Sequence, residues 1–337
     1  MGFFKNTKML QEAKQYGKKR SSFAELFSFL GIMILSGYLH LFVFAIGIFY
    51  YFCSDSAFVD LFVNFTNNVE PLQKRALELI SISPEWLDIY FLFSSAVSIF
   101  FVLFFCKKFD KRPISSLGIR RGGIFKELLC GAALGLVLIS LVYAVGLLLK
   151  VYTFNGFGKI SLPVFLTYML GAAVAAFASE VAERGYLFSA LSKNYGIISA
   201  VIYTCFVSVL FNTVGIKVTP LYILNSFIYS LFAVLYVIKR GNIWGVSAFK
   251  FVWSFCQLVI FGLNSSGVLQ SSSVFNISIV NGFDTLTGGA QGTEGSLISI
   301  LALFIGIGLI LKMKQNEREI AEENETEGEN ENEKEID

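Results

Sequence analysis

Long apolar stretches, separated by short polar connections, run along most of this chain. A membrane-spanning helix needs about 20 predominantly apolar residues, and a window of that size finds eight such stretches. They lie near residues 24–52, 88–106, 127–149, 163–190, 197–214, 220–238, 243–263 and 296–312. The pattern predicts an all-α protein, a polytopic membrane helical bundle with about eight transmembrane helices.

The composition of the 337 residues agrees with this pattern, because 55% are hydrophobic and only 15% are charged. An ordinary soluble domain carries roughly a quarter charged residues, so that class of protein is excluded. The formal net charge of +2 hides a segregation, since 11 of the 25 acidic residues lie in the last 21 positions. The net charge therefore gives no support to a nucleic-acid partner. We expect a lipid bilayer around the chain and no nucleic acid.

Lysine and arginine residues are distributed unevenly over the predicted connections. Twenty of the 27 fall on one side of the predicted membrane, most of them before the first span or in the connection around residues 107–126. Cytoplasmic connections carry an excess of these residues, so we expect a multi-pass cell-membrane protein with both termini cytoplasmic. The first apolar stretch is too long for a signal-peptide core, which favours a retained anchor over a cleaved signal.

The chain divides into four predicted parts. Residues 1–22 form a basic cytoplasmic N-terminus, 23–109 hold two transmembrane helices with an outer loop, 110–313 form the main membrane domain, and 314–337 form an acidic cytoplasmic tail. The tail is rich in Glu and Asn and has almost no apolar residue, so we expect it to be disordered. The outer loop, residues 53–87, has room for a short interfacial helix.

One concentrated set of charged residues lies inside the predicted spans: Glu180, Glu183 and Arg184 in the fourth, and Lys250 in the seventh. Charged residues are costly inside a membrane and are functional candidates by default. Glu180 and Arg184 are four residues apart, so on a helix they share a face and can pair, which lowers the cost of both. A purely structural ion pair explains this spacing equally well.

Three short motifs occur in order around these residues: Ser-Glu-x-x-x-Arg-Gly-Tyr-Leu at 179–187, Val-Thr-Pro-Leu at 218–221 and Gly-Asn-Ile-Trp-Gly at 241–245. Together they resemble the CPBP family of CAAX-type membrane endopeptidases and bacterial bacteriocin-processing and self-immunity proteins. The resemblance covers roughly residues 110–312. It implies the CPBP fold, a bacterial cytoplasmic membrane, and a site in which a Glu, two His and an Asn activate water for peptide hydrolysis.

The sequence departs from that family at the positions that carry its chemistry. Ser179 stands in place of the first glutamate of the Glu-Glu-x-x-x-Arg motif. Asn212 and Lys250 stand in place of the two histidines, and Ser254 stands in place of the asparagine. The one histidine of the chain, His40, lies in the first predicted span, outside the resemblance.

These replacements predict a pseudo-protease with no catalytic residue, whose degenerate site consists of Ser179, Glu180, Glu183, Arg184, Asn212, Lys250 and Ser254. We expect Lys250 to close a network with Glu180 and Arg184 that locks the former site. By analogy with degenerate enzymes, the expected role is to bind or position a membrane or cell-envelope protein partner. The lysostaphin-resistance type of the family is the nearest functional model. No cofactor and no metal are expected.

Three active alternatives stay open. An active CAAX-type intramembrane endopeptidase would work through Glu180 or Glu183. Ser179 and Lys250 also supply the residue types of a nucleophile and its base. Buried Glu, Arg and Lys side chains can mark the path of an ion-coupled transporter, although the chain shows no internal repeat.

Several other features are assigned to packing. Gly131 and Gly135 form a small-x-x-x-small pattern that allows close helix approach, and we expect that contact inside the chain rather than in a dimer. We expect His40 to bond to a neighbouring helix. The five cysteines have no C-x-x-C spacing, which is typical of packing residues rather than of a zinc site.

Overall fold

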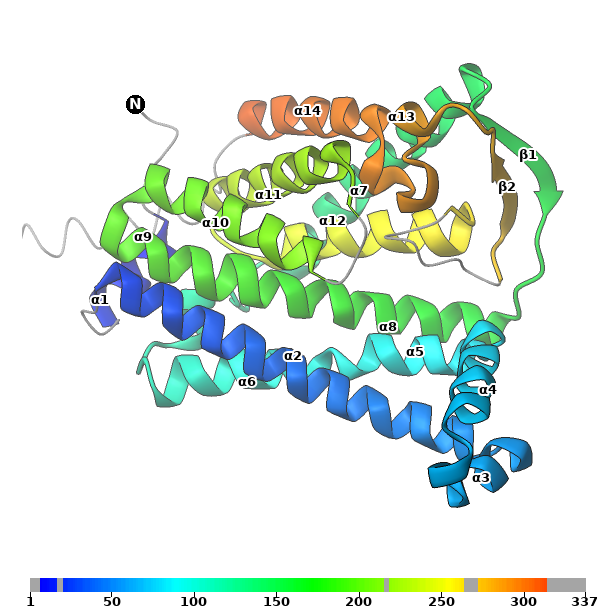
Figure 1. Ribbon diagram of the computed structural model, residues 1–337. Helices are drawn as coiled ribbons and strands as arrows, with labels where there is room; N and C mark the ends of the chain where they lie inside the picture. The colour runs from blue at the N-terminus through cyan, green and yellow to red at the C-terminus, as the bar shows by residue number, and fades with distance from the viewer. Residues whose placement is uncertain (1–6, 17–20, 215–217, 264–271, 314–337) are drawn as a thin grey trace, which may run out of the picture.

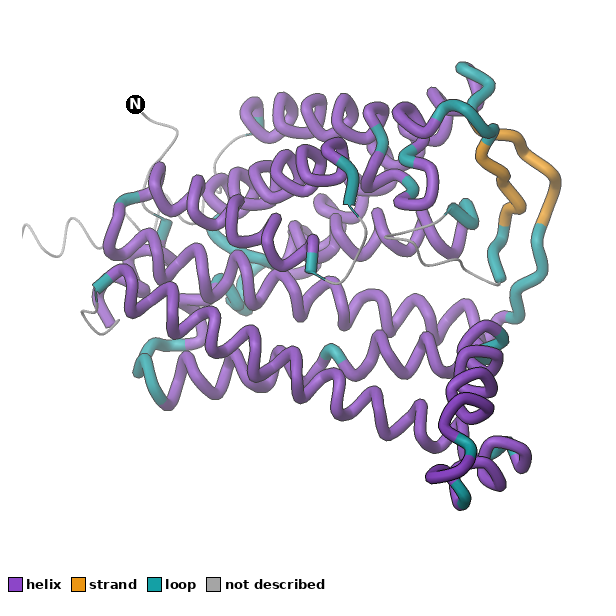
Figure 2. Tube along the Cα trace, viewed as in Figure 1, coloured by secondary structure: helices purple, strands orange, loops and turns teal. Residues whose placement is uncertain are grey.

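The computed structural model describes residues 7–16, 21–214, 218–263 and 272–313. The predicted acidic tail, residues 314–337, therefore lies outside the described residues, as do parts of the predicted N-terminal segment. Within the described ranges the chain forms a bundle of helices with one small sheet (Figure 1, Figure 2).

The elements follow in chain order. The α-helices are α1 (Lys8–Tyr16), α2 (Ser22–Cys53), α3 (Ser56–Val63), α4 (Val69–Ser81), α5 (Glu85–Ser94), α6 (Ala96–Lys108), α7 (Ile124–Leu148), α8 (Leu162–Glu180), α9 (Ser189–Tyr195), α10 (Ile197–Thr213), α11 (Pro220–Arg240), α12 (Trp244–Phe255), α13 (Asp284–Thr287) and α14 (Leu297–Lys312). Two π-helical segments are η3 (Val181–Phe188) and η4 (Cys256–Ile260). Short 3-10 turns are η1 (Phe65–Asn67), η2 (Ile114–Leu117), η5 (Gly289–Gln291) and η6 (Thr293–Gly295). The strands are β1 (Tyr152–Phe157) and β2 (Phe275–Ile279).

All eight predicted spans coincide with helices. Among the described residues, five apolar helical segments are long enough to cross a membrane: Phe23–Cys53, Glu85–Lys108, Ile124–Leu148, Leu162–Lys193 and Pro220–Arg240. Three further apolar segments are shorter: Ile197–Thr213, Trp244–Ile260 and Leu297–Lys312. The prediction of a helical membrane bundle is confirmed.

Local sequence signals set several helix ends. The side-chain oxygens of Ser21 and Ser296 accept backbone N–H groups in the first turns of α2 and α14. Thr219 caps α11 in the same way, and a proline follows it at the first helical position. Gly241 ends α11 with a φ of +67°, a left-handed conformation that glycine adopts without strain. These caps satisfy backbone groups that the helices leave unpaired at their ends.

Helix α8 lies between two groups of helices (Figure 1). On one side α2, α5 and α6 pack together, and α5 and α6 contact α8. On the other side α12 packs against both α8 and α7, while α14 packs against α7 and α11. Helix α1 and the last turn of α14 lie at one end of the bundle, whereas α3, α4 and the sheet lie at the other (Figure 1). The two ends of the described chain therefore lie at the same end of the bundle (Figure 1).

The connections at the far end contain a departure from the all-α prediction. Strand β1 pairs antiparallel with β2, and Tyr152 lies opposite Ile279 while Phe157 lies opposite Phe275. Aromatic and β-branched side chains in both segments favour strands. The strands lie far apart in the sequence, so no hairpin turn indicates their pairing. The sheet joins the connection between α7 and α8 to the connection that follows η4 (Figure 2).

The outer loop predicted at residues 53–87 holds two helices, α3 and α4. The Asp55 carboxylate caps α3 by accepting the Phe58 N–H at 2.7 Å. The Arg75 guanidinium of α4 pairs with the same carboxylate at 2.6 Å, and its hydrogen bonds lower the pKa of Asp55. This ion pair holds α4 against the start of α3 as long as Asp55 is charged.

Helices α7 and α12 approach each other unusually closely because α7 presents glycines to its neighbour. A Cβ atom at Gly131 would collide with the backbone carbonyl group of Gly245, and one at Gly135 would lie 2.9 Å from the Phe249 carbonyl oxygen. The predicted use of these two glycines in packing inside the chain agrees with these contacts.

Polar side chains also pair between helices of the bundle. The His40 ring on α2 lies 3.3 Å from the Ser94 hydroxyl on α5, which is the predicted bond to a neighbouring helix. At the α1 end of the bundle, Glu127 of α7 and Arg240 of α11 form a buried ion pair. All five cysteines are free thiols, and Cys53 is the exposed one.

The close approach of α7 and α12 makes Gly131 intolerant of any side chain. We expect Gly131→Ala to destabilise the protein by about 1–3 kcal/mol, the usual cost of overpacking, because the methyl group meets backbone atoms that cannot rotate away. The melting temperature in detergent measures the loss. Gly308→Ala on α14 is the matched control, since a Cβ there meets no atom within 4 Å. Equal melting temperatures for the two variants would contradict the tight α7–α12 contact.

Candidate functional site

The charged residues of the fourth span lie where helix α8 changes its winding. Glu180 is the last residue of α8, and Glu183 and Arg184 lie in the π-helical segment η3 that follows. π-Helical turns are rare and are often found at functional sites. All three side chains are buried, with Glu180 and Arg184 at 0% relative exposure and Glu183 at 4%. The cost of this burial requires that the charges neutralise each other.

Arg184 contacts both carboxylates. Its Nη1 donates a hydrogen bond to the Glu183 carboxylate at 2.6 Å. Its Nε lies 3.3 Å from one Glu180 carboxylate oxygen, and Nη1 donates to the other at 3.4 Å. The structure therefore places the pair predicted from the four-residue spacing, and adds Glu183 to it.

Lys250 completes the cluster from helix α12. Its Nζ lies 3.5 Å from the Glu180 carboxylate, and its side chain is 24% exposed. Two carboxylates and two cations then leave the cluster with no net charge. The structure thus brings together Glu180, Arg184 and Lys250, the three members of the expected network, from two different helices.

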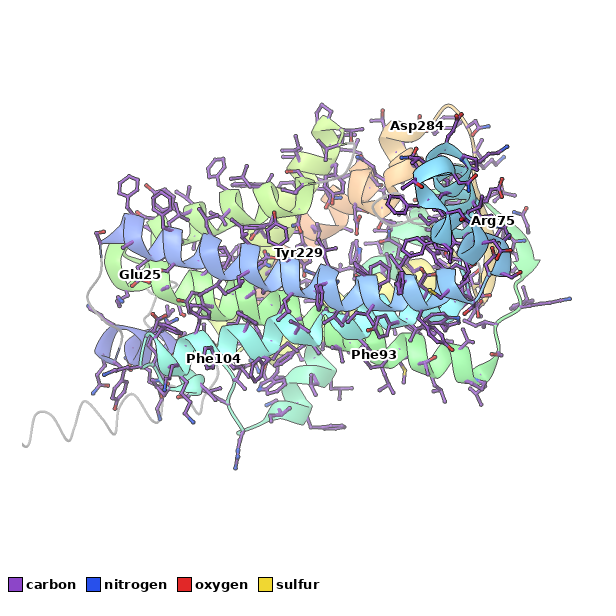
Figure 3. All side chains as sticks on the ribbon, turned by 60° about the horizontal axis from the view of Figure 1, so that its bottom comes forward. Glu25, Arg75, Phe93, Phe104, Tyr229 and Asp284 are labelled. Carbon is purple, nitrogen blue, oxygen red and sulfur yellow. The ribbon has the colours of Figure 1, made fainter. Side chains whose placement is uncertain are left out.

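Tyr229 of helix α11 joins the two cations to the same carboxylate. Its hydroxyl donates a hydrogen bond to Glu180 at 3.1 Å. The Arg184 Cζ and the Lys250 Nζ each lie 5.5 Å from the centroid of its ring, within the range of a cation–π contact. Tyr229 lies near the middle of the long axis of the bundle, between Glu25 at one end and Arg75 and Asp284 at the other (Figure 3).

A cavity of about 140 Å³ opens beside this cluster. At about 30 Å³ for each molecule, it has room for roughly four waters or a small polar group. Its lining includes three positions of the predicted degenerate site, Asn212, Lys250 and Ser254, together with Tyr229. The remaining lining residues are Tyr222, Asn225, Ser226, Trp253, Thr293, Glu294 and Leu303. The site positions of α10 and α12 therefore face one common space, which agrees with a retained framework.

Ser179 takes no part in this cavity lining. Its hydroxyl donates to the Ala176 carbonyl oxygen of its own helix at 2.9 Å, which is a common use of serine inside a helix. Lys250, the other member of the alternative nucleophile and base pair, contacts Glu180 instead. The geometry therefore gives no support to a Ser179–Lys250 dyad.

Two parts of the site were not predicted from the sequence. Tyr229 was missed, although Tyr222, Tyr229 and Tyr236 recur every seven residues and so share one face of α11. Buried tyrosines need a partner for their hydroxyl group, and that pattern was an available signal. The second missed part is the turn η6, where the Thr293 carbonyl accepts the Asn225 amide at 3.0 Å. This bond holds the turn against the cavity.

The cavity has polar side chains in its lining, but the site supplies few groups for hydrolysis. One Glu180 oxygen, Oε1, already has contacts from Arg184, Lys250 and Tyr229. The other oxygen, Oε2, lies 3.3 Å from the Arg184 Nε and makes no hydrogen bond within the described residues. The imidazole of the chain, His40, lies on α2 and contacts Ser94. Among the described residues there is also no group of three or more His, Cys, Asp or Glu side chains placed to hold a metal ion.

The fold and this cluster define a class: a helical membrane protein with a charge-balanced polar cavity between its helices. Residues 161–256, from the start of α8 to the start of η4, match the family model described as Type II CAAX prenyl endopeptidase Rce1-like. This segment of the chain is therefore Rce1-like, similar to CAAX proteases. This confirms the resemblance over a shorter range than 110–312, but one that includes all seven predicted site positions. No curated protein and no solved structure matches the chain.

The charge balance of the cluster predicts how it responds to substitution. We expect Lys250→Met to destabilise the protein by about 1–3 kcal/mol, because it leaves two buried carboxylates with one cation. The loss is smaller than for a fully buried ion because Lys250 keeps partial contact with solvent. Adding Glu180→Gln removes the excess negative charge, so the double variant should recover part of the loss.

Melting temperatures of the single and double variants in one detergent test this expectation. Lys126→Met, at an exposed position of α7, is the control for loss of a lysine charge. A melting temperature for Lys250→Met equal to that of wild type would show that the ion pair with Glu180 contributes nothing to stability.

Proposed function

We propose that this chain is a pseudo-protease of the CAAX protease family, which binds a membrane or cell-envelope protein partner without hydrolysing it. The observation that carries the proposal is the engagement of Glu180 by Arg184, Lys250 and Tyr229. A general base must accept a proton from water, whereas this carboxylate is held in a neutral cluster of fixed charges.

The replaced positions support the same proposal. In the family resemblance, the positions of the two histidines are Asn212 and Lys250, and both side chains line the cavity. An amide is not basic enough to take a proton, and an ammonium group donates but does not accept hydrogen bonds. The cavity keeps its polar lining, so it can still hold part of a partner.

The distribution of charge supports an orientation for this function. The end of the bundle that holds α1 carries most of the basic residues, including those that follow α6. We propose that this end faces the cytoplasm of a bacterial cell, so that both termini are cytoplasmic. The cavity then lies at mid-depth in the membrane, where a transmembrane or lipid-anchored partner can reach it.

Co-purification from gently solubilised native membranes tests the function. Wild-type protein should retain a stoichiometric, full-length partner. The Glu180→Gln, Lys250→Met variant should lose most of it, because Lys250 lines the cavity and pairs with Glu180. The matched control changes an ion pair of the same type at the end of the bundle, where Lys193 and Glu25 lie 2.7 Å apart. Glu25→Gln with Lys193→Met should keep the partner.

A second assay separates this proposal from an active protease. Purified wild-type protein in liposomes should leave a prenylated CAAX peptide intact, the substrate type named in the description of the matched family. Cleavage of that peptide, or a shortened partner that appears only with wild type and not with Glu180→Gln or Glu183→Gln, would overturn the pseudo-protease proposal.

A further inference from the structure

A second hollow lies at the α1 end of the bundle, far from the cavity beside Glu180. It is a groove of about 650 Å³ between α1, the end of α6 and the start of η2. We call it the basic groove, and its lining residues are Glu12, Tyr16, Lys107, Lys111, Arg112, Pro113, Ile114 and Ser115. Its volume is in the range of sites for small molecules.

Three cations and one carboxylate line this groove. The Glu12 carboxylate is offset by Arg120, 3.6 Å away. Lys107 and Lys111 are both exposed, and in the described part of the chain no ion pair engages either of them. Their charges are therefore available to an anion from outside the chain.

Arg112 forms a rigid cationic base for the groove. It is 3% exposed, donates from Nη1 to the Ser189 hydroxyl at 2.9 Å, and lies over the Tyr186 ring at 5.0 Å. Its Nη2 is 3.9 Å from the Asp110 carboxylate and makes no hydrogen bond within the described residues. A buried guanidinium nitrogen without a hydrogen bond has unused donor capacity for an oxygen ligand.

Lys111 occupies a backbone conformation that does not favour lysine. Its φ is +55°, in the left-handed region where Gly, Asn and Asp are enriched. Residues held in such conformations cluster at ligand sites, where the side chain rather than the backbone preference determines the residue. Lys150 has the same conformation at φ +56°, but of the two lysines only Lys111 lines the groove.

Apolar surface adjoins the groove on the side of the membrane-spanning segment. The rings of Phe104 and Phe109 are 45% and 46% exposed, and they flank Lys107 at the end of the span Glu85–Lys108. Phe104 lies on α6 toward the end of the bundle marked by Glu25 (Figure 3). Basic side chains at the end of a span, next to exposed rings, match a ligand with an anionic head and an apolar tail.

We propose that the basic groove binds the phosphate headgroup of an anionic phospholipid, with the acyl chains of that lipid lying along Phe104 and Phe109. Lys107 and Lys111 form ion pairs with the phosphate at the rim of the groove. The Arg112 guanidinium donates a hydrogen bond to it from the bottom of the groove. The site is independent of the cavity beside Glu180 and of any peptide partner.

Native mass spectrometry of the full chain in detergent, titrated with phosphatidylglycerol or phosphatidylcholine, tests the site. Wild type should bind phosphatidylglycerol in preference, and Lys107→Ala with Lys111→Ala should weaken that binding about tenfold or more. Arg121→Ala with Lys126→Ala removes the same charge from exposed positions on the same side of the membrane and should change the affinity by about twofold at most. Lys107→Arg with Lys111→Arg should retain binding, which excludes misfolding as the cause of a loss.

Three results would overturn the proposal. An equal loss in the two alanine double variants would mean that only the general charge of the surface matters. Unchanged affinity in Lys107→Ala with Lys111→Ala would remove the groove from lipid binding altogether. Glycerol 3-phosphate that binds as tightly as phosphatidylglycerol would assign the groove to a soluble phosphate ester.

Discussion

The neutralisation of charge inside a membrane-sized bundle is the constraint on which the rest of this structure depends. Glu180 and Arg184 have no contact with solvent, and each would be prohibitively costly to bury alone. Because one guanidinium cannot neutralise two carboxylates, a second cation from another helix is required. Lys250 supplies it from α12, the helix that packs against α8.

The helix that carries Glu183 and Arg184 winds irregularly at the cluster. Adjacent residues of a regular α-helix point about 100° apart, so Glu183 and Arg184 would not normally meet. In the π-helical segment η3 they form a 2.6 Å hydrogen bond while Arg184 still reaches Glu180 one turn earlier. A second π-helical segment, η4, follows the helix that carries Lys250. Both helices that supply charge to the cluster therefore continue into a π-helical segment, and the one after α12 begins at Cys256.

Hydropathy was sufficient to predict the membrane helices, because apolar length is a property of each segment alone. The pairing of Glu180 with Arg184 was also predictable, since it depends on spacing within one helix. The participation of Tyr229 was not, because it depends on how α11 rotates against α8. The β1–β2 sheet and the turn η6 were missed for a similar reason. Their contacts join segments far apart in the chain and leave no local pattern.

The glycine and lysine patterns were likewise only partly informative: they indicated a local role but not the spatial neighbours. The Gly131 and Gly135 pattern predicted a close helix contact, but only the structure identifies α12 as the neighbour. Likewise, the basic residues after the second span were assigned to topology, and the spacing of Lys107 and Lys111 gave no sign of a groove. The groove exists because α1 packs against η2 and α9 across the end of the bundle.

The two-stranded sheet has a consequence for the order in which the protein is assembled. Strand β1 ends just before the Rce1-like segment begins, and strand β2 starts after that segment ends. The ladder therefore ties together the two ends of the whole segment. During synthesis, β2 follows η4, so the ladder cannot form until every helix from α8 to α12 has been made. The sheet can therefore form only after these helices have been made and both connections lie at the same end of the bundle (Figure 1).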